Sequence, residues 1–96
     1  MPSAFWIAHV TVTDEAAYSK YAALATEAIA AHGGTFLARG GTSIQKEGRA
    51  HPRNVVATFP SLDAANACYE SEKYQEALSH AKGASERDLV LVEAAD

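Results

Sequence analysis

Two glycine pairs, Gly33-Gly34 and Gly40-Gly41, enclose the five-residue segment Thr35-Phe36-Leu37-Ala38-Arg39. The composition of this short segment is typical of a strand. Glycine adopts the left-handed conformation with which many helices end, so the first pair predicts the end of an alanine-rich helix. Glycine also permits a bend or bulge, so the second pair predicts a kink directly after Arg39. The chain should therefore pass here from a helix through a short strand into a kink.

The remaining elements are arranged around this segment. Residues 5–12 alternate in the manner of a strand, and a helix should follow over about residues 14–32, with Thr13 as its N-cap. Ser61 can cap a second helix, and Ser71 can begin a third. We further expect an extension of the second strand over residues 42–46, a strand over residues 53–59 and a last strand over residues 88–93.

The resulting order, β-α-β-β-α-β, predicts an α+β protein of the ferredoxin-like class. In this arrangement a four-stranded antiparallel sheet carries both helical regions on one face. A chain of 96 residues can bury one hydrophobic core without disulfides. We expect a single domain over residues 1–96.

Composition excludes several classes of function. Eight basic against twelve acidic residues give a net charge of −4, which argues against nucleic-acid binding. No apolar run reaches membrane-spanning length, and no signal peptide is evident at the first residues. The lone Cys68 forms no internal disulfide, which suggests a cytoplasmic protein. The four histidines lack metal-ligand spacing and no phosphate-binding glycine motif exists, so we expect neither metal nor cofactor.

Two helical regions can cover only one face of the sheet. In each strand we assign the more apolar parity to that covered face, namely Trp6, Ala8, Val10, Phe36, Ala38, Val55, Ala57, Phe59, Val90 and Val92. The opposite parity holds Phe5, Ile7, His9, Thr11, Leu37, Arg39, Asn54, Val56, Thr58, Leu89, Leu91 and Glu93. This second face is too apolar for bulk water, which predicts a homodimer through it. One bulge would reverse the faces of a strand.

Segments along nearly the whole chain share a further pattern. They are Trp6-Ile7-Ala8-His9-Val10, Gly33-Gly34 to Gly40-Gly41, Glu47-Gly48 followed by Arg53, Phe59-Pro60-Ser61, Ala65, Tyr69, Tyr74-Gln75 and Asp88-Leu89-Val90-Leu91-Val92-Glu93. Together they resemble the domain-of-unknown-function 1330 family. The resemblance implies a ferredoxin-like subunit of the dimeric α/β-barrel superfamily. It implies no established reaction.

Three polar residues of the uncovered parity are candidate catalytic residues. His9, with an ordinary pKa of ~6.5, could act as a base, or simply be a half-buried histidine bonded to a neighbouring strand. Arg39 could hold a carboxylate or phosphate through its planar fork, or form a structural ion pair. Glu93 could orient either of them, although a solvated strand end is the commoner role of such a glutamate.

Thr11, Thr58 and Tyr69 are candidate ligand-binding residues, because their hydroxyls could reach the same cavity. Helix aromatics are more often core than ligand contacts, and Trp6 and the tyrosines Tyr18 and Tyr21 are interpreted as core. Cys68 is interpreted as a small buried hydrophobic residue.

Three hypotheses about function remain open at this point. The first is a cofactor-independent enzyme, an isomerase or an oxygenase-like catalyst, acting on a small anionic or enolisable molecule. The second is a module that binds such a ligand without catalysis. The third is a purely structural dimer. An enclosed pocket with convergent polar groups would separate the first two from the third.

Overall fold

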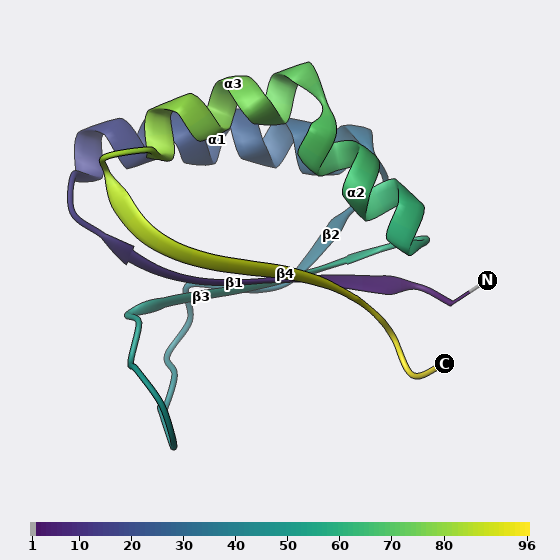
Figure 1. Ribbon diagram of the computed structural model, residues 1–96, viewed down its shortest axis with the longest axis horizontal. Coiled ribbons are helices and arrows are strands. Elements are labelled where there is room, and N and C mark those ends of the chain that lie inside the picture. Colours follow the sequence, from purple (N-terminus) through teal and green to yellow (C-terminus); the bar gives the residue numbers. More distant parts are fainter. Residues whose placement is uncertain (1) are drawn as a thin grey trace.

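Four antiparallel strands form a sheet in the order β2-β3-β1-β4, and three helices lie on one of its faces (Figure 1). The computed structural model describes residues 2–96. The elements are β1 (Ala4–Val12), α1 (Glu15–Ala31), β2 (Thr35–Arg39), β3 (Arg53–Phe59), α2 (Leu62–Glu70), α3 (Glu72–Ala81) and β4 (Ser85–Glu93). The predicted ferredoxin-like α+β class and its element order are confirmed.

Side-chain caps fix where the helices begin. Ser61 accepts a hydrogen bond from the Ala64 amide, and Ser71 accepts one from the Tyr74 amide, so each starts the helix predicted for it. The first helix is capped by Asp14 rather than by Thr13, because the Asp14 carboxylate accepts the Ala17 amide. That prediction was wrong by one residue.

Gly34 joins α1 to β2 at a point where no side chain fits. A Cβ atom there would lie 2.5 Å from Ile29 Cγ2 and 2.8 Å from the Phe59 ring. The last turn of α1 and the end of β3 therefore lie too close together for any side chain at position 34. The predicted role of the first glycine pair is therefore explained by packing as well as by conformation.

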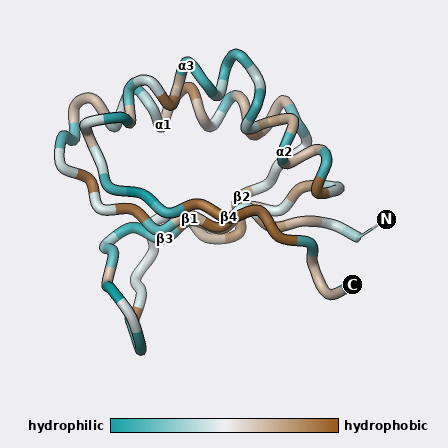
Figure 2. Tube along the Cα trace, viewed as in Figure 1, coloured by the Kyte–Doolittle hydropathy of each residue, from teal (hydrophilic) through white to brown (hydrophobic). Residues whose placement is uncertain are grey.

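The covered face of the sheet is confirmed for the two central strands. Trp6, Ala8 and Val10 of β1 and Val55, Ala57 and Phe59 of β3 are all buried under the helices. Figure 2 shows hydrophobic residues concentrated along the middle of the sheet, below the helices. Cys68 is buried in the same core, as predicted.

The parity predicted for β2 is wrong after Phe36, because Leu37 forms a bulge. Phe36 pairs with Ala57, but Ala38 pairs with the next residue, Val56. The additional residue shifts the alternation by one position. Arg39 therefore lies on the covered side of the sheet, opposite to its predicted face, and Ala38 lies on the uncovered side.

The parity predicted for β4 is also wrong. Leu89 pairs with Ala8 and Leu91 with Trp6, so the leucines face the helices. Val90 and Val92 lie on the other side and are 53 % and 44 % exposed. Both parities of this strand are apolar, so alternation alone does not distinguish them.

Residues 40–52 form a loop that extends away from the helices, below the uncovered face (Figure 1). The predicted continuation of β2 over residues 42–46 is wrong, because this stretch has no strand pairing. Ile44 in the loop is 78 % exposed. Within residues 2–96, no helix is sufficiently long and apolar to cross a membrane.

Candidate functional site

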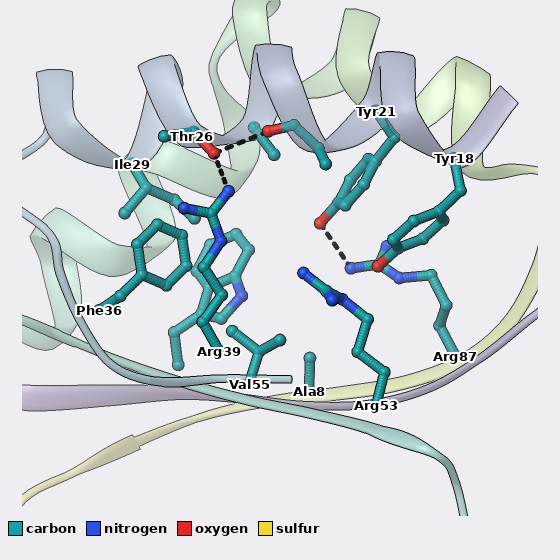
Figure 3. A pocket seen from close by; sticks show the side chains of 13 residues that line it. Ala8, Tyr18, Tyr21, Thr26, Ile29, Phe36, Arg39, Arg53, Val55 and Arg87 are labelled. Atoms are coloured by element: carbon teal, nitrogen blue, oxygen red, sulfur yellow. Dashed lines mark hydrogen bonds between the residues drawn. The ribbon is translucent and has the colours of Figure 1, made fainter. Parts of the chain in front are cut away.

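A pocket lies between α1 and the covered face of the sheet (Figure 3). Its free volume is about 30 Å³, and it is partly open to solvent. A cavity needs roughly 10–15 Å³ by this measure to hold one water, so the pocket has room for about two waters or for a group of that size, such as a carboxylate. The side chains that define its chemistry are Trp6, Tyr18, Tyr21, Thr26, Phe36, Arg39, Arg53 and Arg87.

Arg39 enters the pocket from the edge strand β2 because of the bulge at Leu37. Its guanidinium donates a hydrogen bond to Thr26 Oγ1 on α1. The guanidinium carbon also lies 4.3 Å from the centre of the Phe36 ring, in a cation–π contact. The side chain remains exposed, so Arg39 forms the outer wall of the pocket.

Arg53 enters from the first position of β3, on the same parity as Val55. Its guanidinium carbon lies 5.9 Å from the centre of the Tyr18 ring. Gly40 makes room for this side chain, since a Cβ atom there would lie 2.7 Å from Arg53 Nη1. Gly40 also has a left-handed φ of 71°, which other residues adopt at a cost. Gly40, the first member of the second glycine pair, thus shapes the pocket wall through Arg53.

Arg87 enters from β4 on the opposite side. Its Nη2 donates to the Tyr21 hydroxyl at 2.7 Å and to the Tyr74 hydroxyl at 3.2 Å. The two hydroxyl oxygens are themselves 2.8 Å apart. Figure 3 shows that the three arginines, from three different strands, point into the same space below α1.

Among the residues that the structure describes, none forms an acidic partner for these three arginines. The ion pairs found within residues 2–96 are Arg49–Glu86, His51–Asp88 and Lys73–Glu27, all outside the pocket. Nε of Arg53 and Nε of Arg87 are buried and lack any hydrogen-bond partner in the described chain. Like charges in one partly buried site repel each other, and burial of an unpaired charge is unfavourable. An anion in the pocket would relieve both costs.

Tyr21, which lines the pocket, and its buried partner Tyr74 are neutral hydrogen-bonding groups. Burial, followed by the proximity of Tyr74, raises the pKa of Tyr21 far above its usual range, although Arg87 opposes the shift. Burial likewise raises the pKa of Tyr74. Neither hydroxyl is therefore a base near neutral pH, and each can donate a hydrogen bond.

The three predicted catalytic residues do not meet. His9 is exposed on the uncovered face, where its Nδ1 lies 2.6 Å from Asn54 Oδ1. Arg39 lies on the other side of the sheet. Glu93 pairs with Ala4, five residues along β1 from His9, which is roughly 16 Å. The premise of a shared face is thus wrong, because of the bulge in β2 and the reversed parity of β4.

The three predicted ligand-binding residues are also dispersed. Thr11 Oγ1 lies 2.9 Å from His51 Nδ1, and Thr58 Oγ1 donates to the Ala4 carbonyl at 3.4 Å. Tyr69 lies on α2, where it packs against Trp6 and Tyr74 and lines a separate groove beside β4. None of the three lines the pocket of Arg39, Arg53 and Arg87, which we call the arginine pocket.

A second polar cluster lies on the uncovered side. The ring of His51 is almost fully buried there, with its Nε2 3.5 Å from Asp88 Oδ2 and its centre 6.4 Å from that of His9. Within residues 2–96, no group of three or more His, Cys, Asp or Glu side chains is arranged to hold a metal ion.

Sequence reasoning missed Arg53, Arg87 and Tyr21 as site residues. For Arg53 a signal existed, because it shares the parity of Val55, which was assigned to the covered face. Arg87 lies before the predicted start of the last strand at residue 88. It shares the parity of Leu89, which was assigned to the uncovered face, so both the start and the parity of the strand had to be known. Tyr21 was interpreted as core, and its burial confirms this while its ring also borders the pocket.

Comparison with solved structures shows the same fold in proteins of very different sequence. A protein of unknown function from Rhodopseudomonas palustris is 16 % identical, with a TM-score of 0.82 over 99 % of this chain and 84 % of that one. SnoaB, a cofactor-independent oxygenase from Streptomyces nogalater, is 14 % identical, with a TM-score of 0.70 over 100 % of this chain and 96 % of that one. A dimeric protein of unknown function and ferredoxin-like fold from Bacteroides fragilis is 12 % identical, with a TM-score of 0.64 over 96 % of each chain.

Comparison with sequences gives two further findings. No curated protein matches this chain. The family model described as "Domain of unknown function (DUF1330)" matches residues 3–95, which confirms the resemblance found in the sequence.

Proposed function

Since this chain belongs to the DUF1330 family, whose description names no activity, we propose its function from the site itself. The protein binds a small organic anion in the pocket between α1 and the sheet. Arg39, Arg53 and Arg87 hold the anion, and the aromatic residues enclose its apolar part.

The observation that carries this proposal is the convergence of three guanidinium groups without an acidic partner. Guanidinium groups that only stabilise a fold are usually paired, because an unpaired charge is costly to bury. Here three strands each contribute one arginine to the same pocket, so positive charge is concentrated there although the net charge of the chain is −4. Such a site favours negative ligands strongly over neutral ones.

The shape of the site favours a planar anion. An arginine fork matches the two oxygens of a carboxylate, and flat aromatic rings line the other walls. The free volume of about 30 Å³ admits a head group, while a longer body would extend through the open side past Arg39. A small carboxylate, or an enolate of similar shape, fits these limits.

The test is a titration of the arginine side chains. Each of four probes, acetate, benzoate, oxalate and inorganic phosphate, is added to ¹⁵N-labelled protein while the arginine Nε–H signals are recorded by NMR. We expect saturable shifts at Arg53 and Arg87, whose Nε atoms lack partners, and little change at the exposed Arg49. If all four probes leave Arg53 and Arg87 unchanged, or move Arg49 equally, the pocket is not an anion site.

Catalysis is a second candidate function. The pocket offers positive charge and a neutral hydroxyl donor, which together stabilise an enolate as a water or hydroxide from solvent takes the carbon-bound proton. A protein of the same fold, SnoaB, is a cofactor-independent oxygenase. We therefore also propose a cofactor-independent enzyme, oxygenase-like or an isomerase, that acts on an enolisable acid.

Exchange of carbon-bound hydrogen tests this second candidate. Acetoacetate, an enolisable acid, is incubated with the protein in D₂O, and loss of its C–H signal is followed by NMR. An enzyme that stabilises the enolate accelerates exchange above the uncatalysed rate, and Arg39→Ala removes the acceleration. Binding without acceleration would leave the protein as a ligand-binding module.

We propose in addition that a second copy of the chain covers the uncovered face of the sheet, as in a dimeric α/β barrel. Phe5, Ile7 and Val56 are only half-buried there, and the exposed Val90 and Val92 extend the apolar area. A structural relative is described as dimeric. Light scattering should give twice the chain mass of 10.2 kDa. Val90→Glu should yield monomers, whereas Ala23→Glu on the exposed side of α1 should not.

A further inference from the structure

The hydrogen bonds of the buried pair Tyr21 and Tyr74 determine which atom of a bound ligand faces the pair. Their hydroxyl oxygens are 2.8 Å apart, and by distance either could donate to the other. Arg87 contacts both oxygens, but a guanidinium has only donors and accepts neither hydrogen. Each tyrosine hydroxyl hydrogen therefore needs an acceptor other than Arg87.

The surroundings of the two hydroxyls differ. Tyr74 is fully buried and lines none of the pockets identified, so the Tyr21 oxygen is the one acceptor found for its hydrogen within residues 2–96. Tyr21 lines the arginine pocket, so its hydrogen has a second destination. If Tyr21 donated to Tyr74, the Tyr74 hydrogen would be buried without an acceptor, which is unfavourable. Both hydrogens are used when Tyr74 donates to Tyr21 and Tyr21 donates into the pocket.

We propose that Tyr21 donates a hydrogen bond to an oxygen of the bound anion and thereby selects ligands with an acceptor oxygen next to Arg87. This inference rests on the proposed function, since it concerns the same pocket. Arg87 and Tyr74 both donate to the Tyr21 oxygen, and a hydroxyl that accepts hydrogen bonds becomes a better donor in turn. Burial keeps Tyr21 neutral, so it provides a hydrogen rather than a negative charge that would repel the anion.

The ligand class follows from this chemistry. The oxygen facing Tyr21 carries full or partial negative charge and has a lone pair free beside its contact with Arg87. A carboxylate and an enolate both satisfy this requirement through an oxygen on a planar carbon.

Two single substitutions test the direction of the hydrogen bonds. Tyr21→Phe and Tyr74→Phe each remove one hydroxyl and break the same Tyr21–Tyr74 bond, so each is the control for the other. Acetate affinity is measured by NMR titration for both variants and for the unaltered protein. We expect Tyr21→Phe to weaken acetate binding about tenfold, as for loss of a hydrogen bond to a charged group. Tyr74→Phe should stay within about twofold, because Tyr21 keeps its hydrogen.

The other outcomes overturn the inference. Equal losses in both variants would mean that the pair acts only through structure. Unchanged affinity in Tyr21→Phe would mean that its hydroxyl does not face the ligand. If acetate binds and depends on Arg39 but not on Tyr21, this inference fails and the proposed function stands. If no probe of the panel binds the unaltered protein, both fail.

A measurement on the unaltered protein keeps the inference testable where a variant does not fold. Tyrosine labelled with ¹³C at Cζ reports hydrogen bonding of its hydroxyl. Addition of acetate should shift the Tyr21 Cζ signal by more than the Tyr74 signal. A larger shift at Tyr74 would reverse the proposed direction.

Discussion

Replacement of Arg39 by alanine separates ligand binding from folding better than any other change in the pocket. Arg39 is exposed, and its contacts are a hydrogen bond to Thr26 and a stacking contact with Phe36. Contacts of these kinds at exposed sites each contribute about 0.5–1 kcal/mol. The free energy of unfolding should therefore fall by roughly 1–2 kcal/mol, which leaves most molecules of an ordinary domain folded.

We expect Arg39→Ala to change the free energy of acetate binding by more than it changes the free energy of unfolding. A hydrogen bond between an ionised donor and an ionised acceptor contributes about 1.5–3 kcal/mol, so Arg39→Ala should weaken acetate binding about tenfold or more. Arg39→Lys keeps the charge but loses the planar fork, and should recover only part of the affinity. The assay is an NMR titration with acetate at fixed ionic strength, with unfolding of each variant followed by circular dichroism.

Arg49→Ala is the matched control for this experiment. It removes the same charge, but its side chain is 78 % exposed and pairs with Glu86 at 3.6 Å, outside the pocket. At ~0.15 M salt such a charge is largely screened beyond about 8 Å, so acetate affinity should change less than twofold. The reasoning is refuted if Arg39→Ala binds acetate as the unaltered protein does, or if Arg49→Ala loses as much affinity.

Two further predictions concern the wall of the pocket and the core. Gly40→Ala should lower the free energy of unfolding by about 1–2 kcal/mol, because Gly40 has a left-handed φ. It should also weaken acetate binding, because the new Cβ atom displaces Arg53. Gly41→Ala, with no atom within 4 Å of a new Cβ, is the control in both assays. Cys68 should react slowly with a thiol reagent at pH 8 in the native protein and rapidly in denaturant, since it is buried and burial raises its pKa to about 11; fast native labelling would contradict its place in the core.

The order of elements could be predicted from the sequence because each signal was local. Alternation identified β1 and β3, and the caps at Ser61 and Ser71 identified the break between α2 and α3. The first and last strands, β1 and β4, are neighbours in the sheet. However, antiparallel pairing places Glu93 at the start of β1 and places Asp88, not Glu93, opposite His9. The register, which decides proximity along a strand, was not available from composition.

The site could not be predicted because it depends on which face each side chain takes. In β4 Leu89 and Leu91 face the helices rather than Val90 and Val92, and Arg87 shares their parity and reaches the tyrosines of α1 and α3. Both parities of this strand contain apolar and charged residues, so neither could be assigned from the sequence. For Arg53 the parity was correct, but a guanidinium on a covered face was not considered as a binding group.

The pairing of β2 with β3 determines which face Arg39 takes, and this can be tested by changing the length of β2. Phe36 and Arg39 both face the helices although three positions separate them, because Leu37 is the additional residue between Ala57 and Val56 of β3. Deletion of Leu37 restores regular alternation and leaves Phe36, Ala38 and Arg39 on their present faces. We expect this variant to bind acetate within about threefold of the unaltered protein, since Arg39 remains in the pocket.

Insertion of one alanine between Ala38 and Arg39 has the opposite consequence. It moves Arg39 by one position, to the uncovered face, while Phe36 stays in the core. Acetate affinity should then fall as far as in Arg39→Ala, and a further Arg39→Ala change in this background should have no effect. If deletion abolishes binding and insertion preserves it, the pairing of β2 with β3 is not the one that aims Arg39 at the ligand. If instead deletion preserves binding and insertion abolishes it, anion binding depends on the face that Arg39 takes and not on the fold alone.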